Sequence, residues 1–168
     1  MSSPSLRFVI VGTHNPLYSA EFQRGGAAGS SSSASSQPSS GGIQGSGDGG
    51  SSGRGGGGGE NSQSWFMLHV ALDMVDKIAW INEAKGMYLR TVDKMMSQQV
   101  SAFQTAGSIK FLLIHSGQRS EDSIKNFFYD VYELYVKHSM NPFYKYNTAI
   151  MSKTFDARVR TLARKYLS

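Results

Sequence analysis

The clearest hydrophobic pattern in the chain runs from Ser120 to Asn141 and has the spacing of an α-helix. One predicted face is apolar and largely aromatic, and it holds Ile124, Phe127, Phe128, Val131, Leu134, Tyr135 and His138. The opposite face holds Asn126, Asp130, Glu133 and Lys137. Ser120 suits an N-cap, and Asn141 precedes a proline, which ends the helix. So many aromatic rings on one face need a broad apolar surface opposite them, which a β-sheet most simply provides.

Shorter segments have the patterns of β-strands. Leu6–Val11 and residues 109–115 are apolar at nearly every position, which predicts strands that are buried on both faces. Apolar and polar residues alternate in three further predicted strands, which are residues 17–22, 87–93 and 98–105. Because the two doubly buried strands should be neighbours in the middle of the sheet, the first and the fifth strand are predicted to pair.

The spacing of apolar positions in residues 64–81 predicts a helix that is apolar on two sides. One stripe consists of Trp65, Leu68, Ala71, Leu72, Val75 and Ala79. The second consists of Phe66, Met67, Val70 and Met74, and a narrow polar strip holds His69, Asp73, Asp76 and Lys77. A surface helix normally has a single apolar stripe, so the second needs either another helix of the domain or a partner protein. The sequence alone leaves both explanations open.

A last predicted helix has an apolar face of Phe155, Val159, Leu162 and Tyr166. The element order is then strand, strand, helix, three strands, helix, helix. This order predicts an α/β (α+β) fold with a five-stranded, mainly antiparallel sheet in the order 2-1-5-4-3. One helix is expected on one face and two on the other, which is the longin or profilin-like architecture.

Residues 24–62 differ in composition from the rest of the chain. They contain most of the 19 glycines and many serines, and they cannot bury enough apolar area to offset the entropy of ordering. We interpret them as a disordered insertion within a single domain of residues 1–168. A G-x-G-x-x-G match at residues 45–50 lacks the strand and helix that a dinucleotide site needs. A lone Arg54 among glycines is too little charge for an RNA-binding tail, so no nucleic acid is expected as a partner.

Composition and charge restrict the possible class of protein and its partners. The chain has no cysteine, no apolar run of membrane-spanning length and no signal-peptide cleavage pattern, which predicts a soluble intracellular protein. The net charge of +5 comes from the C-terminal part, where Lys145, Lys153, Arg158, Arg160, Arg164 and Lys165 stand against Asp156 alone. A solvated helix face explains this charge better than an acidic partner or an anionic membrane surface does.

Catalytic patterns are missing from the sequence. The histidines His14, His69, His115 and His138 occur singly, and no P-loop, kinase or G-x-S-x-G signature is present. Asp73 and Asp76 have the spacing of a general acid–base pair, but they also have the ordinary composition of a solvated helix edge. The sequence therefore predicts a binding module that is not an enzyme, with no cofactor and no metal.

Several strings resemble the sedlin family, the small longin-type subunits of the TRAPP vesicle-tethering complexes. They are FVIVGTHNPLYSAEF (8–22), HVALDMVDKIAW (69–80), MYLRTVDK (87–94), VSAFQTAGSIKFLLIH (100–115), IKNFFYDVYELYVKHSMNPFY (124–144) and FDARVRTLARKYLS (155–168). Together they cover nearly the whole chain outside residues 24–62, and S-M-N-P-F-Y is the most specific of them. The departure is the Gly/Ser insertion itself.

The resemblance implies a non-catalytic adaptor. Sedlin-like proteins assemble with other longin-type and α/β-type TRAPP subunits, and they join this core to subunits of the larger complexes. The whole complex acts as a nucleotide exchange factor for Rab-type GTPases in endoplasmic reticulum-to-Golgi and intra-Golgi transport. Such a subunit is cytoplasmic, and it reaches endoplasmic reticulum–Golgi and Golgi membranes only through the complex.

The resemblance also implies one site residue. The aspartate of the A-L-D-x-V-D motif is the family's adaptor contact, and by this motif it is Asp73 here. With the neighbouring apolar stripe, the predicted partner-binding residues are Phe66, Val70, Asp73 and Met74.

Two alternatives remain. Another longin-type trafficking regulator, such as a SNARE N-terminal domain or an adaptor small chain, has the same fold. A SNARE needs a heptad segment and a membrane anchor after the domain, and the sequence ends at Ser168. A small α/β enzyme needs a cluster of His, Asp, Ser and Lys side chains in one deep pocket.

Overall fold

The structure, a computed structural model, describes residues 6–13, 15–22, 58–81, 86–95 and 97–167. Its centre is one five-stranded sheet in the order β2-β1-β5-β4-β3, as the sequence predicts. All of its neighbouring strands pair antiparallel. The strands are β1 (Leu6–Val11), β2 (Pro16–Phe22), β3 (Tyr88–Met95), β4 (Gln98–Gln104) and β5 (Lys110–Ser116).

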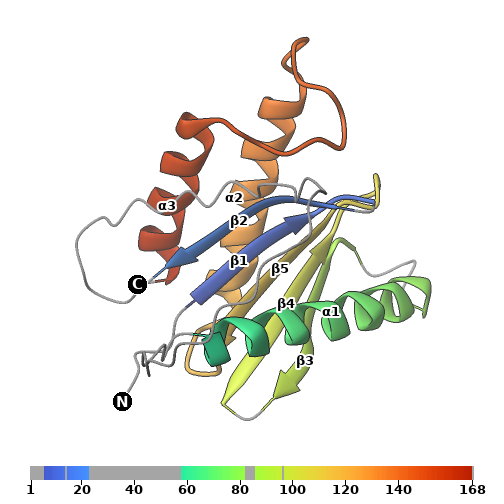
Figure 1. Cartoon of the computed structure of the whole chain (residues 1–168), viewed down its shortest axis with the longest axis vertical. Helices are drawn as coiled ribbons and strands as arrows, with labels where there is room; N and C mark the ends of the chain where they lie inside the picture. The colour runs from blue at the N-terminus through green and yellow to red at the C-terminus, as the bar shows by residue number, and fades with distance from the viewer. Residues whose placement is uncertain (1–5, 14, 23–57, 82–85, 96, 168) are drawn as a thin grey trace, which may run out of the picture.

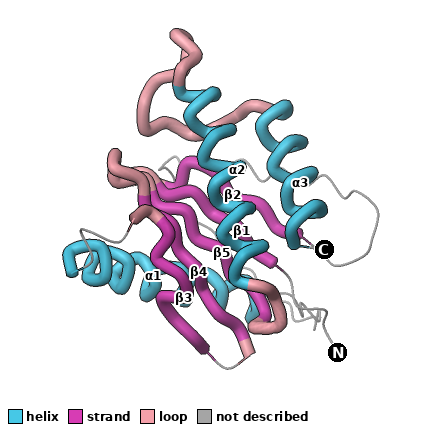
Figure 2. The backbone as a smooth tube through the Cα atoms, turned by 180° about the vertical axis from the view of Figure 1, so that it is seen from behind, coloured by secondary structure: helices cyan, strands magenta, loops and turns pink. Residues whose placement is uncertain are grey.

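Helices cover both faces of this sheet. One face carries α1 (Gly58–Ile81), and the other carries α2 (Glu121–Ser139) and α3 (Lys153–Leu167), which lie side by side (Figure 1, Figure 2). The predicted layers are therefore confirmed. Within the described ranges, no helix combines the length and the hydropathy that crossing a bilayer requires.

The two central strands serve both faces at once. β1 and β5 pair with Phe8 opposite Leu113 and Val9 opposite Leu112. Since successive side chains of a strand point to opposite faces, Phe8 and Leu113 join the core under α2 and α3, while Val9 and Leu112 join the core under α1. This explains why both strands are apolar at consecutive positions.

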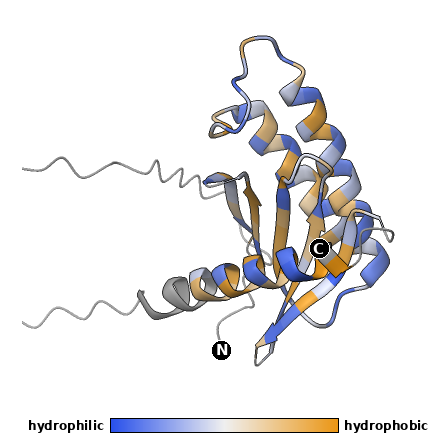
Figure 3. Ribbon diagram, turned by 90° about the vertical axis from the view of Figure 1, so that its right-hand side faces the viewer, coloured by the Kyte–Doolittle hydropathy of each residue, from blue (hydrophilic) through white to orange (hydrophobic). Residues whose placement is uncertain are grey.

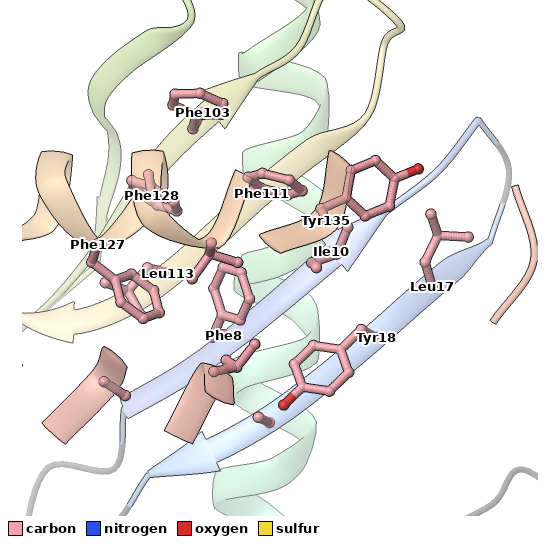
Figure 4. Close-up of a cluster of buried hydrophobic side chains, with 14 of the residues drawn as sticks. Phe8, Ile10, Leu17, Tyr18, Phe103, Phe111, Leu113, Phe127, Phe128 and Tyr135 are labelled. Carbon is pink, nitrogen blue, oxygen red and sulfur yellow. The ribbon is translucent and has the colours of Figure 1, made fainter. Parts of the chain in front are cut away.

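The core under α2 and α3 is rich in aromatic rings (Figure 4). Phe127 of α2 meets Phe8 edge-to-face at 5.3 Å between ring centroids. Phe103 of β4 stacks on Phe111 at 5.6 Å and on Phe128 at 5.9 Å. The aromatic face predicted for this helix thus packs against the sheet, and its buried residues are Ile124, Phe127, Phe128, Val131 and Tyr135.

Some predicted boundaries move. Helix α1 begins at Gly58 and not at residue 64, so residues 58–62, assigned to the disordered insertion, belong to the helix. The apolar periodicity starts only at Trp65, and the polar residues before it carry no such signal. Residues 24–57 of the predicted insertion lie outside the described residues. Ser120 occupies the N-cap position of α2, but its side chain makes no capping hydrogen bond.

Candidate partner-binding surface on helix α1

The residues predicted to bind a partner share the side of α1 that faces away from the sheet. Phe66, Val70, Asp73 and Met74 follow one another at one- and two-turn spacing, and we call them the outer surface of α1. The side chain of Phe66 is 58% exposed and that of Met74 36%, Asp73 is exposed, and Val70 is half-buried. Figure 3 shows the mixture of hydrophobic and hydrophilic residues along this helix. The arrangement presents apolar area beside one carboxylate.

The inner side of α1 differs from the predicted stripes at two residues. Met67, predicted for the second stripe, is buried with the inner residues, whereas Trp65, predicted for the first stripe, is 40% exposed. Met67 falls at the edge between the stripes, so contact with the sheet decides its side. The residues of α1 that pack into this core are Met67, Leu68, Ala71 and Val75. The Arg7 guanidinium lies over the Trp65 ring, 5.4 Å from its centroid.

No other described element therefore packs over the outer surface of α1. The sequence left open whether this stripe is buried within the domain or against a partner. The exposure of Phe66 and Met74 removes the first explanation for the part of the domain that the structure describes. A contiguous exposed apolar stripe beside polar residues is typical of a protein–protein contact.

The two aspartates of α1 have different environments. Asp76 Oδ1 lies 2.6 Å from Lys110 Nζ, and this ion pair ties the helix to the start of β5. Asp73 has no hydrogen bond and no ion pair within the described part of the chain, and its neighbours one turn away are the exposed His69 and Lys77. The two carboxylates do not converge on a shared site, so the acid–base interpretation has no geometric support. Asp73 is instead available to an external donor.

A buried serine–histidine pair lies in the sheet. Nδ1 of His115 is 3.0 Å from the carbonyl oxygen of Ser116, which only accepts, so Nδ1 carries the proton. Nε2 then accepts a hydrogen bond from the Ser101 hydroxyl at 2.8 Å. Burial lowers the pKa of His115, and the charge of Arg119 lowers it further, while the bond to Ser116 opposes both. At 1% and 3% exposure, Ser101 and His115 are closed to a substrate, so the pair is a satisfied structural contact.

The other histidines do not join this pair. The ring of His138 packs on Tyr144 at 4.6 Å and on Phe155 at 5.6 Å, and His69 is exposed on α1. His14 lies outside the described residues. Among the residues that the structure describes, no group of three or more His, Cys, Asp or Glu side chains has the arrangement of a metal site.

Sequence reasoning missed a second exposed apolar region, in the connection between α2 and α3. Met140, Phe143, Tyr146 and Met151 are all largely exposed there. Periodicity does not detect such residues, because a loop has no repeating face. The available signal was compositional, since large apolar side chains are frequent in a segment that Asn141 and Pro142 mark as a loop.

Comparisons with known proteins agree on one family. The family model described as Sedlin matches residues 9–165. The chain is similar to the "Transport protein particle 20 kDa subunit" of Schizosaccharomyces pombe, with 42% identity over 102 residues, which are 61% of this chain and 73% of that protein. It is also similar to the "Probable trafficking protein particle complex subunit 2" of Caenorhabditis elegans, with 45% identity over 100 residues, 60% of this chain and 69% of that protein. The Drosophila melanogaster protein of the same name is 41% identical over 102 residues, 61% of this chain and 71% of that protein.

Proposed function

The chain belongs to the sedlin family, and on this premise we propose that it is a non-catalytic subunit of a TRAPP-type vesicle-tethering complex. Relatives named as subunits of transport or trafficking protein particles support this role. In it, the chain binds other TRAPP subunits of the longin and α/β types and joins them to subunits of the larger complexes. Its contribution is a set of surfaces that hold other chains in place.

The observation that carries the proposal is the outer surface of α1. Burying a large apolar side chain contributes about 1.5–3 kcal/mol, so Phe66 and Met74 together supply a substantial part of a contact. Asp73 lies at the edge of this surface and has no partner among the described residues, which leaves it free for a charge-assisted hydrogen bond from another chain. An apolar surface with one such charged group at its edge favours both affinity and specificity.

The wider role follows from the complex and not from this chain alone. The assembled complex acts as a guanine-nucleotide exchange factor for a Rab-type GTPase in endoplasmic reticulum-to-Golgi and intra-Golgi transport. The chain is then cytoplasmic and lies at these membranes only through the complex. The closed Ser101–His115 pair and the separated Asp73 and Asp76 support a subunit that contributes contacts rather than chemistry.

A reconstitution with substituted chains tests the proposal. The tagged full chain is assembled with purified TRAPP subunits, and the retention of each subunit is measured for the wild type and for Asp73→Tyr. Steric overlap and the lost carboxylate should lower retention of one subunit by at least about tenfold, which is roughly 1.4 kcal/mol. The free energy of unfolding of the isolated chain should change by about 0.5 kcal/mol or less, because Asp73 is exposed.

Two further variants complete the experiment. Asp122→Tyr, the same change at an exposed aspartate of α2, should retain all subunits. Asp73→Asn keeps the volume of the side chain and removes only its charge, so it replaces Asp73→Tyr if that chain misfolds. A folded Asp73 variant that retains every subunit at wild-type strength contradicts the adaptor contact. A wild-type chain that retains no TRAPP subunit contradicts the proposed function itself.

A further inference from the structure

A second apolar surface lies on the connection between α2 and α3. It consists of Met140, Phe143, Tyr146 and Met151, which are 75%, 95%, 59% and 81% exposed, and we call it the loop surface. The connection projects beyond the ends of the two helices (Figure 2). Single exposed apolar residues are ordinary, but so many large ones in one short segment indicate a binding surface.

Hydrogen bonds hold this segment against the sheet. Ile150 N donates to the Leu17 carbonyl oxygen at 2.8 Å, which ties the segment to β2. Thr13 N donates to Asn147 Oδ1 at 3.1 Å, and Tyr146 Oη donates to the Gly107 carbonyl oxygen at 3.1 Å. The anchors thus reach the β1–β2 turn, β2 and the β4–β5 turn. A segment fixed at three places displays its apolar side chains with little entropy left to lose on binding.

The β1–β2 anchor depends on a particular glycine. Asn147 has a φ of 60°, in the left-handed region, and its side chain lies directly against Gly12. A Cβ atom at position 12 would overlap Asn147 Oδ1, so only glycine permits this close approach. The left-handed conformation of Asn147, which asparagine tolerates, and the close approach at Gly12 together indicate that the fold specifies the loop conformation.

Local contacts turn one aromatic ring inward and its neighbour outward. Asn141 Oδ1 accepts a hydrogen bond from Phe143 N at 3.0 Å, which closes a turn around Pro142. Tyr144 then packs on His138 at 4.6 Å between ring centroids, and its hydroxyl donates to the Thr148 carbonyl oxygen at 2.8 Å. Phe143 is left almost fully in solvent, although it is as apolar as the rings of the core.

The loop surface is basic as well as apolar. Residues 140–153 contain Lys145 and Lys153 and no acidic residue, and both lysines are exposed. The nearest acidic residue that follows, Asp156, already accepts hydrogen bonds from Tyr18 at 2.7 Å and from Arg160 at 2.8 Å. A hollow of about 320 Å³ lies within the loop, and Phe143, Lys145 and Met151 are among the residues that line it. A partner that fits this surface has apolar side chains next to carboxylates.

The loop surface is separate from the outer surface of α1. α1 covers one face of the sheet, and the connection between α2 and α3 belongs to the other; Figures 1 and 3 show them at opposite ends of the molecule. Two chains can therefore occupy the two surfaces at the same time. An adaptor needs two such surfaces, one for each of the parts that it joins.

Resting on the proposed function, we infer that the loop surface is a second docking site, which binds an acidic, apolar segment of another subunit of the same complex. The hollow admits an apolar side chain of that segment beside Phe143 and Met151, and Lys145 and Lys153 pair with its carboxylates. Two lysines attract an anionic membrane by only about 1 kcal/mol each, so a protein segment fits this surface better than a lipid bilayer does.

The reconstituted complex tests this inference with Phe143→Ser and Lys145→Glu. Each substitution should weaken retention of one subunit by about tenfold or more, and that subunit should differ from the one that Asp73→Tyr releases. The control is Lys125→Glu, which reverses an exposed charge on α2 and should release nothing. A photo-crosslinking amino acid at position 143 of the assembled complex should attach to an acidic segment of the released subunit.

Several outcomes overturn the inference. Full retention of every subunit by both loop variants does so, and so does a crosslink that joins position 143 only to a second copy of this chain. Phosphatidylcholine–phosphatidylserine vesicles serve as a separate probe: loss of vesicle binding in Phe143→Ser with all subunits retained assigns the surface to a membrane instead. A failure of the proposed function gives a different result, because the wild-type chain itself would then retain no TRAPP subunit.

Discussion

The two faces of the sheet are covered by cores of different chemistry. Under α2 and α3, the buried residues include the rings of Phe8, Phe103, Phe111, Phe127 and Phe128. Under α1, the buried side chains are valine, leucine, isoleucine, alanine and methionine. The same two strands, β1 and β5, contribute to both cores, so the difference originates in the helices and in the residues that the strands turn toward them.

Because of this difference, the two faces should contribute differently to the stability of the fold and to partner binding. α2 buries its aromatic face and turns polar residues such as Asn126 and Glu133 to solvent. α1 buries smaller side chains and keeps Phe66 and Met74 outside. Since the free energy of burial grows with apolar area, the α2–α3 face should carry most of the stability of the fold. The α1 face keeps apolar area available for a partner.

The largest expected effect comes from truncating the aromatic core. Phe128 is fully buried and lies 5.9 Å from Phe103 and 6.0 Å from Tyr88 between ring centroids. Phe128→Ala removes this packing and leaves a cavity, so the free energy of unfolding should fall by about 3–5 kcal/mol. Urea denaturation followed by circular dichroism measures the loss.

Asn126→Ala is the control for this prediction. Asn126 lies on the exposed side of the same helix, so its truncation should change the free energy of unfolding by about 0.5 kcal/mol or less. Equal denaturation midpoints for Phe128→Ala and Asn126→Ala would show that the assignment of the two faces of α2 is wrong.

A smaller effect is expected in the core under α1. Leu68 is 3% exposed and packs with Met67, Ala71 and Leu112. Leu68→Ala should lower the free energy of unfolding by about 2–4 kcal/mol, and amide hydrogen exchange in α1 should accelerate more than exchange in α2. Phe66→Ala is the matched control, because Phe66 is 58% exposed on the same helix and should cost little in the isolated chain. If Leu68→Ala destabilised the chain more than Phe128→Ala, the α2–α3 face would not carry most of the stability of the fold.

The same contrast explains which features were predictable from sequence. Strands β1 and β5 and helix α2 have long, strongly periodic or fully apolar patterns, and these gave the sheet order and the aromatic core correctly. The patterns are informative because burial on one face or on both faces is their direct physical cause. Asp73, Phe66, Val70 and Met74 share one face of α1 because they lie at helical spacing, and this too follows from the sequence. Their partner-binding role stays a prediction.

Features that depend on contacts between distant segments were not predictable. Leu89 and Val92 both pack toward α1, although strict alternation puts them on opposite faces, because the pairing of β3 with β4 shifts register twice. Met67 joins the inner side of α1 for a similar reason, since contact with the sheet selects among nearly equivalent helix faces, while Trp65 stays partly exposed against Arg7. The contact of Asn147 with Gly12 and Thr13 joins residues far apart in the chain and leaves no local pattern.

A still smaller effect is expected from shortening the Gly/Ser-rich segment that precedes α1. Deleting residues 28–52 leaves a connection of about ten residues between β2 and α1, and the lower entropy of closing it should stabilise the fold by about 1 kcal/mol at most. Assembly with TRAPP subunits should be unchanged. Denaturation and reconstitution of the deletion variant measure the two quantities. A folded deletion variant that no longer assembles would show that the segment itself binds a partner.

The smallest expected effect concerns a buried polar residue, His115, in the core under α2 and α3. His115 lies on the same side of β5 as Phe111 and Leu113, and its imidazole is neutral because burial lowers its pKa below the ordinary value of 6.5. Below pH 6.5 the unfolded chain therefore binds more protons at this residue than the folded chain does. The contribution of His115 to the free energy of unfolding should level off above about pH 7.5 and should decrease as the pH falls through 6.5 toward the lowered pKa. Protonation would also remove the acceptor that Nε2 offers to Ser101.

Urea denaturation between pH 7 and pH 5 measures this dependence above the range in which most carboxylates titrate. His115→Asn removes the titrating group, so the slope of stability against pH should become flatter even if the variant is less stable at every pH. Asn126→Ala is the control: this exposed side chain of α2 carries no titrating group, so the pH slope should stay close to that of the wild type. A slope that His115→Asn leaves unchanged would mean that His115 takes up protons in the folded chain as readily as in the unfolded one. In that case the aromatic face admits water to its polar pair, and the contrast between a closed core under α2 and an open surface on α1 would be weaker than the structure indicates.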